Sequence, residues 1–195
     1  MFGNVMNNKQ IRDARAQGNL IITPFSEDRL KTIHYPLTPD KILKRGADTP
    51  DGDFEFDVKR DFDINSRAYT IQPAEYVVVE ISEHIKLGHN IVGHFITTSN
   101  MINKGLSLSA GRIEAPFGDF EGKRQMVRFG LTNMSDRPVD ISSDDRIAYV
   151  YFLDIRGLDN LGLEMTAEER REYSAWIRRK RKASDDGVFY GDGSG

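Results

Sequence analysis

The chain is 195 residues long, carries a net charge of −3 at pH 7 and contains no cysteine. This length suffices for one hydrophobic core, and 38% hydrophobic with 29% charged residues is typical of an ordered globular protein. The absence of cysteine excludes disulfides, cysteine–zinc sites and cysteine catalysis. Four scattered histidines predict no metal site, and the small net charge gives no reason to expect nucleic acid as a partner. No apolar run approaches the ~20 residues of a membrane span and the N-terminus does not resemble a signal peptide, so we expect a cytoplasmic protein.

The N-terminal region predicts a short helix over residues 8–18. Asn8 can cap it, because its side-chain oxygen can accept a hydrogen bond from the first helical turn. Ile11 and Ala14 share one helix face, and Gly18 suits the left-handed position after the last turn. We therefore expect this helix to pack through Ile11 and Ala14.

The rest of the chain up to residue 153 predicts strands. Residues 19–24 predict a strand that ends at a proline, and residues 45–66 predict a long surface excursion with a short hairpin near residues 54–58. A block rich in β-branched and aromatic residues follows. Its candidate strands, separated by turn signals, are residues 69–72, 75–82, 90–97, 106–109, 125–132, 139–141 and 146–153. Many short strands at this spacing predict a sandwich, jelly roll or barrel.

The C-terminal region predicts a second helix. Thr166 and Glu169 form a capping box that opens a helix ending near Lys182, and the basic residues 178–182 are typical of a solvated helix end. The glycine- and aromatic-rich residues 187–195 predict a flexible tail. We therefore expect a β domain over residues 1–160 and a C-terminal helix with its tail over residues 161–195.

Three stretches, in this order along the chain, resemble the dUTPase/dCTP deaminase superfamily, and its deaminase branch in particular. Residues 11–25 (IRDARAQGNLIITPF) and residues 105–122 (GLSLSAGRIEAPFGDFEG) are similar to two family motifs. In the third stretch, Asn133 precedes Arg146 by 13 positions, which is the family spacing.

The resemblance implies a mainly β subunit, folded as a distorted jelly roll or β-barrel. It implies a homotrimer with active sites between subunits that bind a deoxynucleoside triphosphate (dCTP or dUTP) with Mg²⁺. Family enzymes either cleave the bond between the α and β phosphates or replace the amino group of cytosine by oxygen.

The resemblance places the phosphate-binding stretch at residues 98–105. The family serine is retained as Ser99, but both family arginines are replaced, by Thr98 and Asn103. An arginine fork binds phosphate in a bidentate way that asparagine cannot reproduce. The candidate nucleotide-binding residues are Ser99, Asn100, Asn103, Lys104, Ala110, Gly111, Arg146 and Tyr149. The alternatives are ordinary surface polar residues in the helical turn and a structural role for Arg146.

The resemblance also identifies candidate catalytic acids. Glu114 occupies the position where dUTPases carry an aspartate that orients the hydrolytic water, and Asp119 adds a second carboxylate nearby. The glutamate that activates water in deaminases is replaced by Gly130. Strand alternation places Phe129 and Leu131 on the core face, so Gly130 faces the expected site without a functional group.

These features predict a protein of deoxynucleotide metabolism that binds a nucleotide as a homotrimer and has eroded catalytic residues. If it is an enzyme, it is a dCTP deaminase or a dUTP pyrophosphatase, and Glu114 or Asp119 supplies the acid. The alternative is a non-catalytic regulatory or structural trimer that binds a protein partner.

Overall fold

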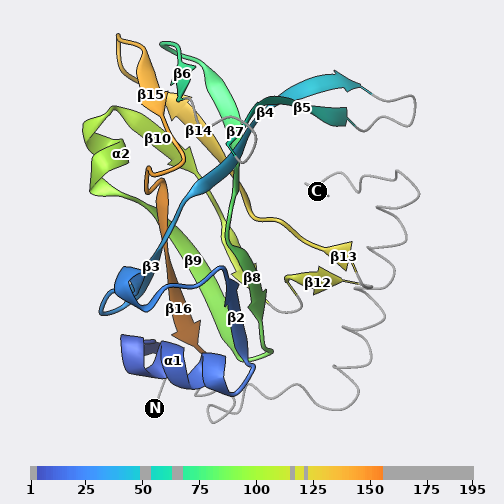
Figure 1. Cartoon of the computed structure of the whole chain (residues 1–195), viewed down its shortest axis with the longest axis vertical. Helices are drawn as coiled ribbons and strands as arrows, with labels where there is room; N and C mark the ends of the chain where they lie inside the picture. Colours follow the sequence, from blue (N-terminus) through green and yellow to red (C-terminus); the bar gives the residue numbers. More distant parts are fainter. Residues whose placement is uncertain (1–3, 49–53, 63–67, 115–116, 121–122, 156–195) are drawn as a thin grey trace, which may run out of the picture.

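Strands dominate the computed structural model, which describes residues 4–48, 54–62, 68–114, 117–120 and 123–155 (Figure 1). One five-stranded antiparallel sheet, the β16 sheet, contains β1 (Asn4–Val5), β3 (His34–Leu37), β9 (Ile91–Thr97), β11 (Arg112–Glu114) and β16 (Ala148–Asp154). A second, the β7 sheet, contains β4 (Pro39–Asp48), β5 (Phe54–Asp61), β7 (Tyr76–Ile81), β10 (Leu106–Ser109) and β14 (Arg128–Asn133). Three strand pairs complete the described strands: β2 (Leu20–Thr23) with β8 (His84–Leu87), β6 (Tyr69–Ile71) with β15 (Val139–Ile141), and β12 (Asp119–Phe120) with β13 (Lys123–Arg124).

The last described strand organises its sheet. All seven residues of β16 pair with β9, while its other edge pairs with β3 and then with β1. In the β7 sheet the strand order is β10–β14–β7–β4–β5. The described strands thus form two open sheets rather than a closed barrel, and the mainly β, jelly-roll-like fold expected from the sequence is confirmed.

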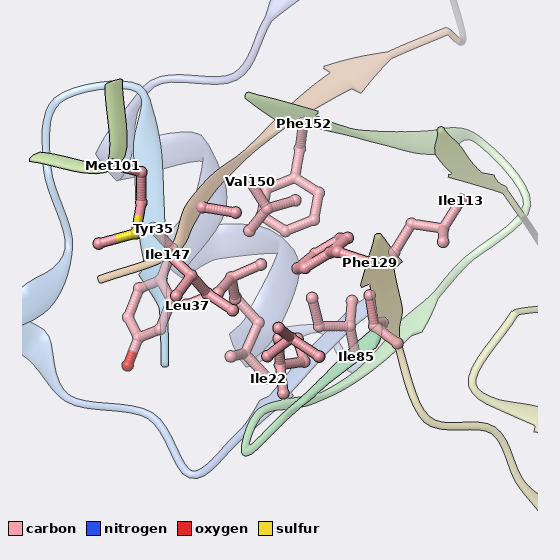
Figure 2. Packing of buried hydrophobic residues seen from close by; sticks show 14 of the residues in the cluster. Ile22, Tyr35, Leu37, Ile85, Met101, Ile113, Phe129, Ile147, Val150 and Phe152 are labelled. Carbon is pink, nitrogen blue, oxygen red and sulfur yellow. The ribbon is translucent and has the colours of Figure 1, made fainter. Parts of the chain in front are cut away.

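The hydrophobic core lies between the inner faces of the two sheets. Val150 and Phe152 of β16 are fully buried, and Phe129 of β14 lies close to them with 2% of its surface exposed (Figure 2). Phe95 of β9 meets the Phe129 ring edge-on at 4.8 Å between ring centres, so an aromatic pair joins the sheets. Leu131 is also fully buried and Arg128 is exposed, as the alternation predicts, but Gly130 on the face of Arg128 is buried as well.

The N-terminal helix α1 (Asn8–Ala16) lies at one end of the molecule (Figure 1). The prediction that Asn8 caps it is wrong by one residue: Asn7 is the cap, since its side chain accepts from the Gln10 backbone N–H while the Gln10 side chain accepts from the Asn7 N–H. Ile11 and Ala14 are buried as expected.

The predicted hairpin near residues 54–58 is too short. β4 and β5 form a longer hairpin that projects beyond the rest of the β7 sheet (Figure 1), and β4 also pairs with β7. Its outer half is polar because it packs on little else, which gives the appearance of a loop in the sequence. The expected C-terminal helix, the basic residues 178–182 and the tail lie outside the described residues. Within the part of the chain that is described, no helix combines the length and the apolar character needed to cross a bilayer.

Candidate functional site

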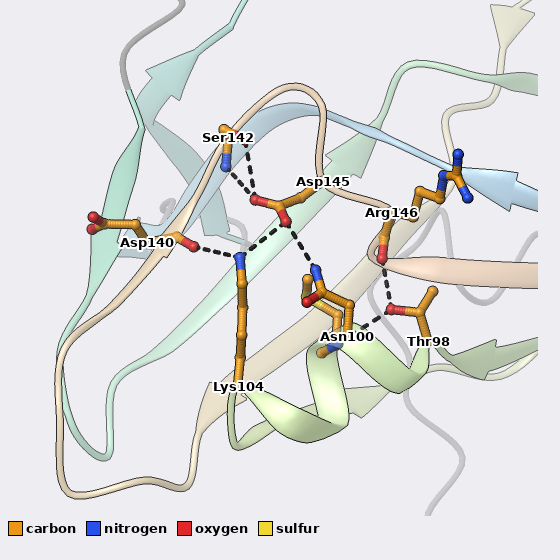
Figure 3. A network of polar contacts seen from close by, with 8 residues as sticks. Thr98, Asn100, Lys104, Asp140, Ser142, Asp145 and Arg146 are labelled. Atoms are coloured by element: carbon orange, nitrogen blue, oxygen red, sulfur yellow. Dashed lines mark hydrogen bonds and ion pairs between the residues drawn. The ribbon is translucent and has the colours of Figure 1, made fainter.

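The expected phosphate-binding stretch forms the helical turn α2 (Ser99–Asn103), directly after β9. Thr98 is its N-cap: the hydroxyl accepts from the Met101 N–H at 3.3 Å and donates to the carbonyl of Arg146 at 2.7 Å (Figure 3). Thr98 is buried, with 1% of its surface exposed. Thr98 therefore fastens α2 to the segment before β16.

Asn100 and Lys104 both bind the carboxylate of Asp145 (Figure 3). The Lys104 ammonium lies 2.9 Å from Asp145 Oδ1, and the Asn100 amide donates to the same oxygen at 3.2 Å. Ser142 donates to Oδ2 through its N–H at 2.9 Å and its hydroxyl at 3.1 Å. Burial alone would raise the pKa of Asp145, but the bonds from Ser142 and Lys104 outweigh it and lower this pKa below its ordinary value. At neutral pH the carboxylate is therefore charged and bonded on both oxygens.

The remaining candidates at this end of the molecule are accessible to solvent. Ser99 and Asn103 are exposed on α2, and the exposed guanidinium of Arg146 points away from Asp145 (Figure 3). Tyr149 is half-buried on β16, where its ring lies 4.2 Å from the ring of His34. The structure thus brings Ser99, Asn103 and Arg146 to the same end of the sheet.

The predicted acid Glu114 lies in another part of the chain. It is exposed at the end of β11, its carboxylate is 3.9 Å from the Arg112 guanidinium, and it pairs with Val92 of β9. Val92 precedes Thr97 by five residues, so roughly 17 Å of strand separates Glu114 from α2. Ala110 and Gly111 are exposed between β10 and β11, and Asp119 lies in β12 opposite Arg124.

The space above Gly130 is filled by the ring of Tyr76. Gly130 lies opposite Val78 of β7, and Tyr76 lies two residues before Val78 on the same face. A Cβ atom on Gly130 would come within 2.5 Å of the Tyr76 hydroxyl oxygen and 2.7 Å of its ring carbon Cε2. A glycine in a strand often marks such a close approach. Any side chain at this position would have to displace the tyrosine.

A carboxylate that sequence reasoning missed lies on the same face, at Glu80 of β7. Glu80 is 5% exposed and is held between Arg128 at 2.7 Å and Lys41 at 3.3 Å. Alternation along β7 places Glu80 on the face of Tyr76, but its partners depend on strand register, which the sequence does not specify. Because both cations bind it, Glu80 is a structural counterion here.

A separate cavity of about 230 Å³ lies between α1 and the turn from β8 to β9, lined by polar residues that include Gln10, Asp13 and Asn90. None of the predicted site residues lines it. Among the described residues, no group of three His, Asp or Glu side chains is placed to hold a metal ion.

The mainly β chain with two facing sheets defines a protein of the jelly-roll-like class. Residues 5–155 match the profile of the dCTP deaminase-like family, and the chain belongs to that family. It is thereby part of the dUTPase/dCTP deaminase superfamily of nucleotide metabolism, as the sequence motifs predicted.

Solved structures show the same relationship at the level of fold. The 2′-deoxycytidine 5′-triphosphate deaminase from Agrobacterium tumefaciens superposes with a TM-score of 0.58 at 12% identity, covering 79% of this chain and 49% of the deaminase. This chain therefore spans about half the length of that enzyme. Two dUTPases are similar at a lower level. The EIAV dUTPase has a TM-score of 0.39 and 17% identity, covering 62% of this chain and 88% of the dUTPase. A mutant dUTPase from phage phi11 of S. aureus with a structural Mg(II) ion has a TM-score of 0.45 and 13% identity, covering 70% of this chain and 90% of the dUTPase. A search of curated protein sequences found no match.

Proposed function

We propose that this family member is a cytoplasmic homotrimer that binds dCTP or dUTP together with Mg²⁺ and does not deaminate the base. The Tyr76 ring above Gly130 is the observation that carries this proposal. Water must be activated by a carboxylate for deamination. The position that the resemblance assigns to this carboxylate is Gly130, which lies beneath the Tyr76 ring. Glu80, the nearest buried acid on that face, is neutralised by Arg128 and Lys41.

The phosphate contacts are assigned to the exposed polar groups near α2. The Ser99 hydroxyl and the Asn103 amide are neutral donors, and the Arg146 guanidinium is the cation that can bind a phosphate oxygen in a bidentate way. Ala110 and Gly111 would supply backbone groups to the base, and Tyr149 would supply a ring at the edge of the site. The β domain of residues 1–160 would carry the site, with residues 161–195 as a separate C-terminal element.

The distance between the two groups of candidates supports a site between subunits. Glu114 and α2 are roughly 17 Å apart along β9 in one subunit, which is too far for both to contact one reacting phosphate. The homotrimer implied by the family would bring Glu114 and Asp119 of one subunit to α2 of another. In that arrangement Glu114 and Asp119 are the candidate acids for any residual hydrolysis.

The described residues offer no carboxylate cluster for a resident metal ion. They do not form a dedicated Mg²⁺ site, so no step of this proposal depends on a protein-bound metal. Mg²⁺ would enter with the triphosphate, whose oxygens are its preferred ligands.

The direct test incubates the purified full chain with dCTP or dUTP and Mg²⁺ and follows ammonia and pyrophosphate. We expect neither product, together with a nucleotide-dependent rise in melting temperature and a trimer mass by light scattering. Ammonia or pyrophosphate release that Glu114→Gln abolishes would instead establish an enzyme. A monomeric mass would contradict the site between subunits.

A second candidate function is a trimer that binds a protein partner. Ile102 of α2 is 62% exposed and Met134 is 72% exposed, and Met134 N–H donates to the carbonyl of Gly105 just after α2. Two exposed apolar side chains beside the helical turn would suit a protein contact. The absence of any nucleotide effect on the melting temperature would favour this second function.

A further inference from the structure

The carboxylate of Asp145 receives four hydrogen bonds, two on each oxygen. Lys104 and Asn100 donate to Oδ1 from α2, and the N–H and hydroxyl of Ser142 donate to Oδ2 from the adjacent turn (Figure 3). The Asp145 side chain is only 13% exposed, and Lys104 is further fixed by the carbonyl of Asp140 at 3.0 Å. The donors are therefore positioned by the fold from two separate segments of chain.

This donor set is the one that proteins use for oxyanions. An ammonium, a side-chain amide, a hydroxyl and a backbone N–H converge on one carboxylate, and all four donate to its oxygens. A carboxylate and a phosphate group both offer negatively charged oxygens that accept hydrogen bonds from such donors. The difference is that here the anion belongs to the chain itself.

We propose that Lys104, Asn100 and Ser142 form an anion cradle that Asp145 fills as a built-in ligand, and that removing this carboxylate opens a site for a phosphate or pyrophosphate group. Asp145 occupies the N–H groups of Lys104 and Asn100 that face the cradle. Where this inference concerns nucleotides it rests on the proposed function, and Asp145 then competes with the substrate's phosphates for the α2 donors. The cradle itself is independent of that function.

The test compares the full-length wild type with Asp145→Ala and with Asp144→Ala, a matched control one residue away whose side chain is exposed. Pyrophosphate binding is measured by calorimetry. We expect Asp145→Ala to bind pyrophosphate about tenfold more tightly than wild type, because charge-assisted donors are vacated. Asp144→Ala should bind it like wild type. In the double variant Asp145→Ala/Lys104→Met the gain should disappear, since the ammonium is gone.

Equal pyrophosphate affinity in wild type and in folded Asp145→Ala overturns the cradle. If Asp145→Ala aggregates, it is refolded in phosphate and in chloride at equal ionic strength. Because phosphate stabilises folded proteins in general, the gain in soluble yield from phosphate over chloride is compared with that of Asp144→Ala. A larger gain for Asp145→Ala supports the proposal, and an equal gain overturns it. Binding of dCTP to wild type is measured in parallel, because its absence refutes the proposed function without affecting the pyrophosphate result.

Discussion

Arg29 donates a 2.6 Å hydrogen bond to Glu83, a carboxylate with no exposed surface. The same carboxylate accepts from the backbone N–H of Thr38 at 3.0 Å and from its hydroxyl at 2.9 Å. Glu83 lies between β7 and β8, whereas Thr38 separates β3 from β4, so one side chain connects two strand junctions. This connection fixes where the chain leaves one sheet for the other.

We expect Glu83→Gln to lower the free energy of unfolding by about 3 kcal/mol, because it leaves the Arg29 charge partly buried without a counterion. Urea unfolding at pH 7 measures the change. The matched control is Glu27→Gln, which removes an exposed pair with Arg12 and should cost less than about 1 kcal/mol. Equal losses in the two variants would contradict the structural role of Glu83.

The second prediction concerns the contact between Tyr76 and Gly130. A methyl group at Gly130 relieves the entropic cost of a glycine in a strand, about 0.5–1 kcal/mol, but must push the Tyr76 ring aside. In the Tyr76→Ala background the second effect vanishes. We therefore expect Gly130→Ala to be about 1 kcal/mol more favourable in that background than in wild type, as measured by a double-mutant cycle. A coupling energy near zero would show that the ring does not cover Gly130.

The third prediction is a pH dependence at Glu75. Burial alone would raise its pKa, but hydrogen bonds from Lys44, from the Gln72 N–H and from Tyr69 lower the pKa of Glu75 below its ordinary value of 4.5. A lowered folded pKa means that the stabilisation is complete above the unfolded pKa and is lost as pH falls through the folded value. We expect Glu75→Gln to cost about 2 kcal/mol at pH 7.

The cost of Glu75→Gln should shrink below pH 4.5 and vanish once wild-type Glu75 is protonated. Urea unfolding at a series of pH values measures this convergence. Glu114→Gln is the control, since Glu114 is exposed and should give the same stability as wild type throughout. If the loss of unfolding free energy in Glu75→Gln did not depend on pH, it would arise from altered packing and not from the charge of Glu75.

The fourth prediction tests the helix cap. Asn7→Ala should destabilise the protein by about 1 kcal/mol, because the Gln10 N–H loses its acceptor and the capping box is broken. Asn8→Ala removes no side-chain hydrogen bond among those found in the described residues, so we expect a change within about 0.5 kcal/mol. Thermal unfolding measures the stability of both variants. A larger loss of stability in Asn8→Ala than in Asn7→Ala would support Asn8 as the N-cap.

The fold was predictable where local pattern and tertiary environment agree. The strands at residues 106–109 and 139–141 are where alternation and turn signals place them. β3 was missed because Pro36 argues against a strand, yet the proline is tolerated since β3 lies at a sheet edge. β8 was missed because it is short and mostly buried without alternation.

The site was less predictable because its decisive contacts join distant parts of the chain. Ser142 and Asp145 are three residues apart, a spacing that signals a local side-chain turn. Lys104 is far from both in sequence, so the phosphate-binding motif gave no indication of its ion pair with Asp145. The same holds for Tyr76 and Gly130, whose contact depends on the register between β7 and β14.

The central place of β16 also constrains how the protein is made. Its partners begin at residues 4, 34 and 91, yet β16 itself starts only at Ala148. During synthesis β1, β3 and β9 therefore each lack their β16 partner until this final described strand leaves the ribosome. Such late, long-range pairing slows folding and exposes strand edges to other chains, so the nascent protein is most vulnerable to aggregation just before residue 154 emerges.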